Sequence, residues 1–377
     1  MRETDIAVVG GGPAGLSAAV AASRLGAKVA LIDDNDRLGG QLIKQTHKFF
    51  GSRHHYCGTR GMDIATILEQ ELRGLPAEIL PGTSVVGLYS APPLAPRPSP
   101  LADGVLALAG RERFTKLGFK RLIVATGAAE NNLLFENNDL PGVYGAGAVQ
   151  TLMNVYGVRP GARVLMVGSG NIGLIVSYQL IQAGIEVAAV VEALPKIGGY
   201  HVHAAKLARL GVPILTSHTI IRALGNEEVE GAVICRVDKN FKPLPGTSRR
   251  LRVDTICLAV GLTPLSELLW QSGCRMVYVP ELGGHVAWHN ENMQTSLGHV
   301  YLAGDVSGIE EASTAMLEGR VAGAHAAMSL GKVPLAGQAP AEQVIAEAQA
   351  ELASIRKGPF GDKAACGKAK LAGCAPV

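Results

Sequence analysis

A glycine turn near the N-terminus constrains this chain more than any other feature. Apolar residues 6–9 predict a β-strand that runs directly into Gly10-x-Gly12-x-x-Gly15, followed by an alanine-rich helix and a second strand at 29–32. In such a βαβ unit the first glycine permits the tight turn, the second lets backbone approach a diphosphate, and the third lets helix and strand pack closely. The diphosphate then lies at the helix N-terminus.

An acidic residue stands where such a unit needs one. Asp33 directly follows the second predicted strand, and a carboxylate there can accept hydrogen bonds from an adenosine ribose. The alternative is a glycine-rich turn without a ligand. Strand, helix and acid in register favour a dinucleotide site over that alternative.

The same pattern recurs in the middle of the chain. A predicted strand at 164–167 leads into Gly168-x-Gly170-x-x-Gly173, a helix and a strand at 187–191. Glu192 is then the candidate ribose acid, and because no arginine follows closely, NAD is favoured over NADP. Since a glycine turn also serves packing alone, this segment could instead bind another adenine nucleotide or none.

Composition narrows the class of protein. The 377 residues, 47% of them hydrophobic, leave room for two or three domains, and 47 glycines with only 5% aromatics suit glycine-rich nucleotide turns. A net charge of +3 without a basic block predicts no nucleic-acid partner. A strand that begins at Ile6 leaves no room for a secretion signal, so we expect a cytoplasmic protein.

Two further sequence features bear on surroundings and chemistry. Residues 164–185 carry no charge, but the second glycine turn interrupts them, so we expect a strand, turn and helix and no membrane span. The six cysteines contain no C-x-x-C pair, as expected of reduced thiols, which argues against disulfide reductase chemistry.

Four elements, in this order, resemble the two-dinucleotide-binding-domain flavoproteins of the glutathione reductase and thioredoxin reductase type over roughly residues 5–330. They are the first glycine turn with Asp33, Ala125-Thr126-Gly127, the second glycine turn, and Thr295-Ser296 followed by Tyr301-Leu-Ala-Gly304-Asp305. The resemblance implies FAD in the first segment, with Asp305 on the flavin ribityl chain. It also implies a helix after Glu311 that points its N-terminus at the isoalloxazine carbonyl, where the helix dipole stabilises the anionic reduced flavin. The alternative for Asp305 is a residue that only caps a turn.

The fold class expected is α/β, with a FAD-binding Rossmann-like domain, split in sequence, and an inserted NAD(P)-binding Rossmann-like domain. We place the FAD-binding domain at 1–145 and 270–330 and the inserted domain at 146–269. A C-terminal helix, Ala341 to Lys357, and a flexible tail make up 331–377. A proline-rich stretch at 91–100 predicts an exposed loop within a meander of short strands.

The candidate site residues lie where predicted strands end or helices begin. Those expected to contact FAD are Gly10, Gly12, Pro13, Ala14, Gly15, Asp33, Gly40, Gln41, Ala125, Thr126, Gly127, Gly304, Asp305 and Ala312. Those expected to contact NAD are Gly168, Gly170, Asn171, Ile172, Gly173, Glu192 and Gly261. Flavin chemistry requires no amino-acid nucleophile.

Two residues are weak catalytic candidates, and no metal site is expected. His47 and Cys57 belong to a polar stretch with His54, His55 and Tyr56 that could line a cleft, although ordinary loop residues are the simpler interpretation. His201 and His203 would point to different faces of a predicted helix, which argues against a shared metal.

Within this superfamily, four segments resemble the α subunits of dye-linked proline, hydroxyproline and opine dehydrogenases, with relatives in sarcosine oxidase and hydrogen cyanide synthase. They are Leu38-Gly-Gly-Gln-Leu42, His47-Lys-Phe-Phe-Gly51, Arg60-Gly-Met-Asp63 and Leu140-Pro-Gly-Val-Tyr144. The resemblance implies electron transfer in a hetero-oligomer whose flavin-containing partner subunit oxidises an amine or imino acid. FMN at a subunit interface and an iron-sulfur protein are compatible with such a complex.

The chain departs from that pattern near its C-terminus, where several such subunits carry a cysteine-rich iron-sulfur segment. Cys366 and Cys374 are only two thiols, which argues against a cluster held by this chain alone.

Two other functions stay open. One is a stand-alone NADH:acceptor oxidoreductase or NADH oxidase, and the other is a non-catalytic nucleotide-binding scaffold subunit.

Overall fold

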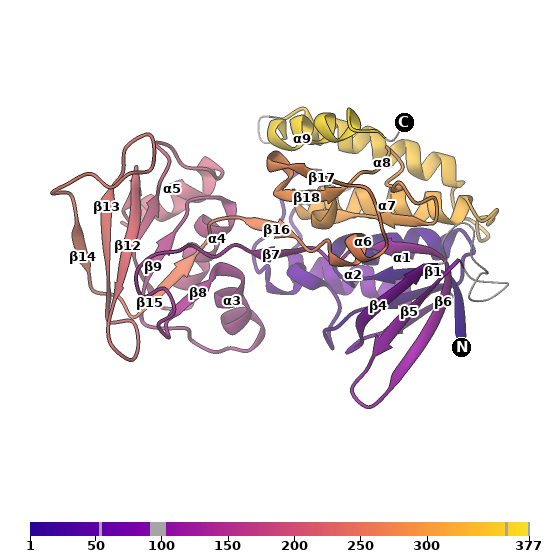
Figure 1. Ribbon diagram of the computed structural model, residues 1–377, viewed down its shortest axis with the longest axis horizontal. Coiled ribbons are helices and arrows are strands. Elements are labelled where there is room, and N and C mark those ends of the chain that lie inside the picture. The colour runs from indigo at the N-terminus through magenta and orange to yellow at the C-terminus, as the bar shows by residue number, and fades with distance from the viewer. Residues whose placement is uncertain (53–54, 91–102, 359–360, 376–377) are drawn as a thin grey trace. The chain divides into compact units, whose positions relative to one another are not determined.

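The computed structural model describes residues 1–52, 55–90, 103–358 and 361–375. Contacts divide the chain into two compact units: unit 1 is Met1–Ala129 with Thr263–Val377, and unit 2 is Glu130–Leu262 (Figure 1). The two connecting segments pair with each other as strands β7 (Ala128–Glu130) and β16 (Leu262–Pro264). Both boundaries lie nearer the N-terminus than the expected 145 and 269. Unit 2 begins earlier because β8 (Val143–Gly145) pairs with one of its strands.

Unit 1 is built on a parallel sheet in the order β3-β2-β1-β6-β19, with two antiparallel strands added on one side. The parallel strands are β1 (Arg2–Val9), β2 (Val29–Ile32), β3 (Ala77–Leu80), β6 (Phe114–Val124) and β19 (Val300–Leu302). β4 (Ser84–Ser90) and β5 (Gly104–Ala109) form a meander with the first half of β6. The buried strand expected near Arg121 is thus the end of a longer strand, and the proline-rich loop at 91–100 lies outside the described residues.

Helices cover this sheet. Each of the last three helices in the sequence packs against the next one along the chain (Figure 1). The longer ones are α1 (Pro13–Arg24), α2 (Gly61–Arg73), α7 (Ala312–Met328), α8 (Ala341–Arg356) and α9 (Asp362–Ala372). α9 corrects the expectation of a flexible tail after the C-terminal helix. Its glycine, alanine and lysine content suggested little structure, but Leu371 is buried in an apolar cluster with Val279, Leu282 and Val286.

The contact between α1 and α7 depends on glycine. A Cβ on Gly319 would lie 2.1 Å from the carbonyl oxygen of Ala14, and one on Gly323 would lie 2.2 Å from that of Ala18. The two helix backbones therefore touch directly. The small residues that make up most of α1 are buried in this contact, because short side chains let the two helices pack closely.

Unit 2 repeats the parallel arrangement in the order β11-β10-β9-β15-β8. Its strands are β8, β9 (Arg163–Val167), β10 (Glu186–Glu192), β11 (Ile214–Thr216) and β15 (Thr255–Leu258), with an antiparallel sheet of β12 (His218–Leu224), β13 (Gly231–Arg236) and β14 (Arg249–Leu251). Its helices are α3 (Ala146–Gln150), continued by a π-helical turn at Thr151–Val155, α4 (Asn171–Gln182) and α5 (His201–Arg209). The predicted α/β fold class with two Rossmann-like sheets is confirmed.

The uncharged stretch at 164–185 is the strand β9, a glycine turn and the helix α4, as expected. Among the described residues, none of the helices combines the length and the apolar character that crossing a lipid bilayer would require.

The α1 and α7 contact gives a stability prediction. We expect Gly323→Ala to lower the free energy of unfolding by about 1–3 kcal/mol, because the new methyl group meets backbone that cannot move aside. This loss should appear although alanine is favoured over glycine in a helix by roughly 0.5–1 kcal/mol. Gly74→Ala is the control, since its Cβ would approach no atom closer than 3.4 Å. Equal unfolding midpoints in urea for both variants would contradict the close packing of these helices.

Candidate functional site

The carboxyl ends of the parallel strands of unit 1 bring most of the predicted FAD residues to one edge. The Gly10 N–H donates to the Ile32 carbonyl at 2.8 Å, and the Ala125 N–H donates to the Val9 carbonyl at 2.8 Å. The Ala303 N–H donates to the Val124 carbonyl at 3.0 Å, which places the Gly304-Asp305 pair beside the same edge. Residues from the beginning, middle and end of the sequence thus meet at the place where open α/β sheets bind ligands.

The three glycines of the first turn divide into two kinds. Gly10 has φ +104°, and a Cβ there would lie 2.2 Å from the Ala125 carbonyl oxygen, while a Cβ on Gly15 would lie 1.7 Å from the Gly10 carbonyl oxygen. The fold itself demands these two glycines. Gly12 is different, because its φ is −74° and a Cβ would meet nothing closer than the Cα of Gly40 at 3.9 Å. The fold does not require a glycine there, and the open space is what a closely approaching ligand would need.

The N-terminus of α1 is suited to an anion. Within the described chain no side chain caps this helix, and Pro13, which has no N–H, occupies the start of the helix. The N–H groups of Ala14 and Gly15 therefore lie in a first turn where intrahelical acceptors are lacking. Together with the open position at Gly12, this turn can accept a diphosphate.

Asp33 is held at the end of β2 by backbone groups. Its Oδ2 accepts the Gly11 N–H at 2.5 Å, and its Oδ1 accepts the Asn35 N–H at 2.8 Å. Burial raises the pKa of this carboxyl, and the hydrogen bonds from Asn35 and Gly11 oppose that rise. The side chain is thereby oriented beside the glycine turn, as a ribose acceptor must be.

Asp305 has spare hydrogen-bonding capacity. It lies in the 3₁₀ turn η5 (Gly304–Ser307), and the one hydrogen bond that its carboxyl makes in the described chain is a long one, 3.4 Å from the Glu310 N–H to Oδ1. Burial, together with the charges of Glu318 and Glu310, raises the pKa of Asp305 to about 6. A partly buried carboxyl to which so few protein groups donate can accept a hydrogen bond from a hydroxyl group of a bound ligand.

Glu318 is a site residue that sequence reasoning missed. Its side chain on α7 is 2% exposed, and its Oε2 accepts the Gly304 N–H at 2.9 Å and the Ser307 hydroxyl at 2.7 Å. A Cβ on Gly304 would lie 2.8 Å from the Cβ of Ala14, so the turn that Glu318 supports touches the first glycine turn. A single acid among the small apolar residues of a predicted buried helix was the available signal.

The remaining FAD candidates of unit 1 lie around this edge. The Thr126 hydroxyl donates to the Leu265 carbonyl at 2.6 Å, and Gly127 has φ +75° with open space at its Cβ position. A Cβ on Gly40 would lie 2.8 Å from the Cα of Gly12, with Gln41 exposed next to it. Ala312 is the first residue of α7. The contacts of all these residues with a cofactor stay a prediction.

The two catalytic candidates stay a hypothesis. His47 stacks on Phe49 with ring centroids 5.9 Å apart, and Cys57 is exposed. His55 contacts Glu351 at 3.0 Å, and His54 lies outside the described residues.

Unit 2 repeats the geometry of the first glycine turn. Gly168 has φ +105° and a Cβ would lie 2.2 Å from the Ala259 carbonyl oxygen, while a Cβ on Gly173 would lie 2.2 Å from the Gly168 carbonyl oxygen. Gly170 has φ −66°, and a Cβ there would meet nothing within 4 Å. The middle glycine is again one that the fold does not require.

The acid and the flanking residues of unit 2 also correspond to those of unit 1. Glu192 Oε2 accepts the Ser169 N–H at 2.9 Å and the Ser169 hydroxyl at 2.8 Å. Asn171 begins α4, Ile172 is 40% exposed, and Gly261, with φ +113°, accepts the Asn131 N–H at 3.0 Å.

Unit 2 has a Gly-Gly pair, Gly198-Gly199, that corresponds to Gly39-Gly40 of unit 1 and was not among the predicted residues. The Gly199 N–H donates to the Ser169 carbonyl at 2.9 Å, as the Gly39 N–H donates to the Gly11 carbonyl at 2.8 Å in unit 1. The sequence signal was present, because a Gly-Gly pair follows the acid at the end of the second strand in both halves of the chain.

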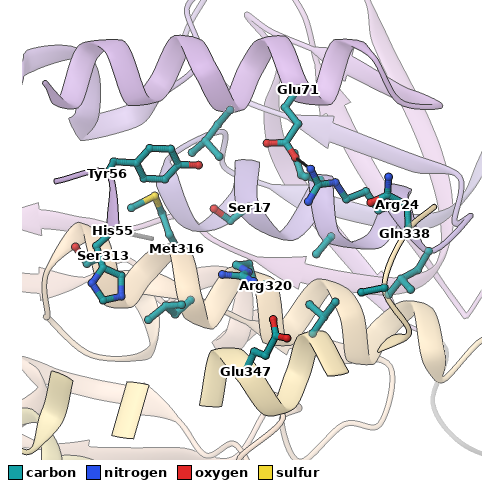
Figure 2. Close-up of a pocket in the computed structure, with 17 residues that line it drawn as sticks. Ser17, Arg24, His55, Tyr56, Glu71, Ser313, Met316, Arg320, Gln338 and Glu347 are labelled. Atoms are coloured by element: carbon teal, nitrogen blue, oxygen red, sulfur yellow. Dashed lines mark ion pairs between the residues drawn. The ribbon is translucent and has the colours of Figure 1, made fainter. Parts of the chain in front are cut away.

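Unit 1 contains a separate cavity of about 370 Å³, shown in Figure 2. It is lined by α1, α2, α7, the loop at Tyr56 and the start of α8, and the Arg24–Glu71 ion pair lies at its side (Figure 2). Burial and the charge of Glu71 raise the pKa of Tyr56. None of the predicted FAD residues is among the described residues that line this cavity, so it is distinct from the candidate site.

Comparison with known proteins agrees with this geometry. Residues 4–319 match the family model described as pyridine nucleotide-disulphide oxidoreductase. The chain is 29% identical to the alpha subunit of sarcosine oxidase from Corynebacterium sp. (strain P-1), over 90% of this chain and 34% of that protein. It is 26% identical to the HcnB subunit of hydrogen cyanide synthase from Pseudomonas protegens, over 86% of this chain and 70% of that protein. The chain thus spans about a third of its sarcosine oxidase relative.

Solved structures show the same fold. L-proline dehydrogenase from P. horikoshii superposes with a TM-score of 0.68 at 23% identity, over 93% of this chain and 59% of that chain. Thioredoxin reductase of T. acidophilum superposes with a TM-score of 0.71 at 20% identity, over 88% of this chain and 100% of that chain. The family model covers both glycine turns and the Gly304-Asp305 pair. The chain belongs to the pyridine nucleotide-disulphide oxidoreductase family and is an FAD-dependent oxidoreductase.

Proposed function

We propose that this chain is the electron-transfer component of a complex in which a partner dehydrogenase oxidises an amine or imino acid of the proline, hydroxyproline, opine or sarcosine type. The observation that carries the proposal is the Asp305 carboxyl, with one long hydrogen bond, beside a glycine turn that stands open at Gly12. The names of its relatives support a role within a complex, since they include the alpha subunit of sarcosine oxidase and one subunit of opine oxidase.

The residues at the edge of unit 1 fit FAD. The N–H groups of the first turn of α1 would bind the diphosphate, Asp33 the adenosine ribose, and Asp305 a ribityl hydroxyl. Bound FAD supplies the redox chemistry, which accepts and releases electrons without an amino-acid nucleophile. The start of α7 would direct its N–H groups and its dipole at the ring. The chain's own task is to orient the cofactor.

For unit 2 we propose NAD(H) or another adenine nucleotide, bound at the open position of Gly170 with Glu192 on the ribose. Two further components complete the proposed complex: an FMN at the interface with the partner dehydrogenase, and an iron-sulfur protein as electron acceptor. The alternatives are a chain that oxidises NADH alone and a scaffold whose nucleotides serve structure only.

Gly12 gives a direct test of the FAD site. We expect Gly12→Ala to weaken FAD binding by on the order of tenfold, about 1.4 kcal/mol, because the methyl group enters the space that the diphosphate needs. The thermal midpoint of the flavin-free protein should stay within a few degrees, because the fold leaves this position open. Gly170→Ala is the matched control and should keep FAD affinity unchanged. Unaltered FAD binding by Gly12→Ala, measured by flavin fluorescence, would contradict the proposed diphosphate position.

The Asp305 carboxyl predicts a pH dependence. Its pKa in the flavin-free protein is raised to about 6, and a ribityl hydroxyl that donates to it would favour the ionised form. FAD binding should therefore lower this pKa and release a proton, so affinity should rise with pH up to about 6 and then level off. The rise should approach tenfold for each unit by which binding lowers the pKa. The side chain of Asp305→Asn cannot ionise, so the FAD affinity of this variant should not change with pH over this range. If its FAD affinity still rose with pH by the same factor, Asp305 would not be the source of the pH dependence.

The direction of electron flow separates the proposed function from its alternatives. We expect the FAD-reconstituted chain to be yellow and to lose its absorbance anaerobically when NADH, or the partner dehydrogenase with its amine substrate, is added. Steady turnover of NADH by the isolated chain would favour the stand-alone oxidase. Full turnover of the assembled complex with Asp305→Ala would favour the scaffold. A chain that stays oxidised with both donors does not transfer electrons.

A further inference from the structure

A buried cluster of charges links the C-terminal helices to the turn that carries Asp305. Its centre is Glu318 on α7, whose Oε2 accepts from the Gly304 N–H and the Ser307 hydroxyl. Its Oε1 accepts from Arg356 Nη2 of α8 at 2.6 Å and from Lys368 Nζ of α9 at 2.9 Å. One carboxylate thus joins the candidate flavin turn on one side to both C-terminal helices on the other.

The two cations are themselves fixed by further contacts. Arg356 makes two hydrogen bonds to Glu310, Nε to Oε2 at 3.0 Å and Nη2 to Oε1 at 2.6 Å. Lys368 Nζ donates to the Ser307 carbonyl at 3.1 Å and to the Ser307 hydroxyl at 2.8 Å. The paired contact of the planar Arg356 guanidinium with Glu310 restricts geometry more than a single hydrogen bond does, and the several charge-assisted bonds of Lys368 fix its ammonium group.

The cluster keeps the Glu318 carboxylate charged. Burial alone would raise the pKa of Glu318, but the charges of Lys368 and Arg356 overcome this and hold the pKa below its usual value. His289, which lies 3.3 Å from Lys368 Nζ, stays neutral because burial and Lys368 lower its pKa to about 3. An ionised Glu318 is the stronger acceptor for the Gly304 N–H.

From this arrangement we infer that Lys368 and Arg356 are positioning residues of the flavin site, which fix the Gly304–Ser307 turn and hence Asp305. Both act through Glu318, and Lys368 also holds Ser307 of the turn directly. The inference rests on the proposed FAD site. It gives α8 and α9 a role in cofactor binding although both lie beyond the last glycine motif of the sequence.

The electrostatic surroundings of Asp305 come from four elements. Glu310 belongs to the loop before α7, Glu318 to α7, Arg356 to α8 and Lys368 to α9. The two carboxylates raise the pKa of Asp305, and the two cations face them from the C-terminal helices. Loss of the Glu318 charge should therefore lower the pKa of Asp305 and move the pH step of FAD binding to lower pH.

Lys368→Met and Lys370→Met form a matched pair of test variants on the same helix. Lys370 is 55% exposed and pairs with Glu281, away from Glu318. The measurements are FAD affinity and amide hydrogen exchange over residues 304–308 in the flavin-free protein. We expect Lys368→Met to speed amide exchange at Gly304 about tenfold, since a charge-assisted contact is lost. FAD binding should weaken by about the same factor. Lys370→Met should match the unmodified chain in both.

A double variant tests whether Lys368 acts through Glu318. Glu318→Gln with Lys368→Met removes one anion and one cation, so the cluster stays balanced in charge. Its loss of FAD affinity should be smaller than the sum of the two single losses, because the two residues share one contact, while Lys368 keeps separate contacts with Ser307. Both the double variant and Glu318→Gln alone should show the pH step of FAD binding at lower pH. If Lys368→Met does not fold, Arg356→Lys, which keeps the charge but loses the paired contact to Glu310, takes its place.

A purely structural tail would behave differently. Lys368→Met would then lower the unfolding midpoint but leave Gly304 exchange and FAD affinity unchanged, and that result overturns the inference. Additive losses in the double variant would overturn it as well. Failure of the unmodified chain to bind FAD would instead count against the proposed function, while exchange at Gly304 in Lys368→Met would still decide whether the tail fixes the turn.

Discussion

Direct backbone contact at the ends of the parallel strands is the constraint on which the rest of unit 1 depends. The Gly10 turn fits against the Ala125 carbonyl only because Gly10 has no side chain, and α1 touches α7 only because Gly319 and Gly323 have none. At the same edge the ends of β1 and β19 each hydrogen-bond to the end of β6, which lies between them. A site assembled from three distant parts of the sequence follows from that approach.

The same turn in both units separates what glycine does for the fold from what it does for a ligand. The first and third glycines of each turn would clash with backbone if they had a Cβ, whereas Gly12 and Gly170 would not. Unit 2 thus retains the open position that a nucleotide would need, which is a stronger reason to expect one there than the motif alone.

Charge organises the other side of the Gly304–Ser307 turn. A buried carboxylate is costly unless cations and hydrogen-bond donors surround it, and Glu318 has both. The donors belong to the turn before α7, and the cations belong to α8 and α9. Packing of the C-terminal helices and geometry of the Asp305 turn are therefore connected through Glu318, and for α9 also through the contacts of Lys368 with Ser307.

Local sequence pattern was enough to predict the two βαβ units and the acids at their second strands, because each depends on spacing that a chain can satisfy within about thirty residues. The Gly304-Asp305 pair was predicted from the resemblance of its segment to a flavoprotein family. Sequence reasoning misjudged the tail, where α9 is stabilised by contacts such as Leu371 with Leu282 that local composition does not reveal. It also missed the Glu318 cluster, since Gly304, Arg356 and Lys368 become neighbours only through folding. Tertiary structure alone decided which charges surround Asp305, because electrostatic interactions depend on distance in space and not on distance along the chain.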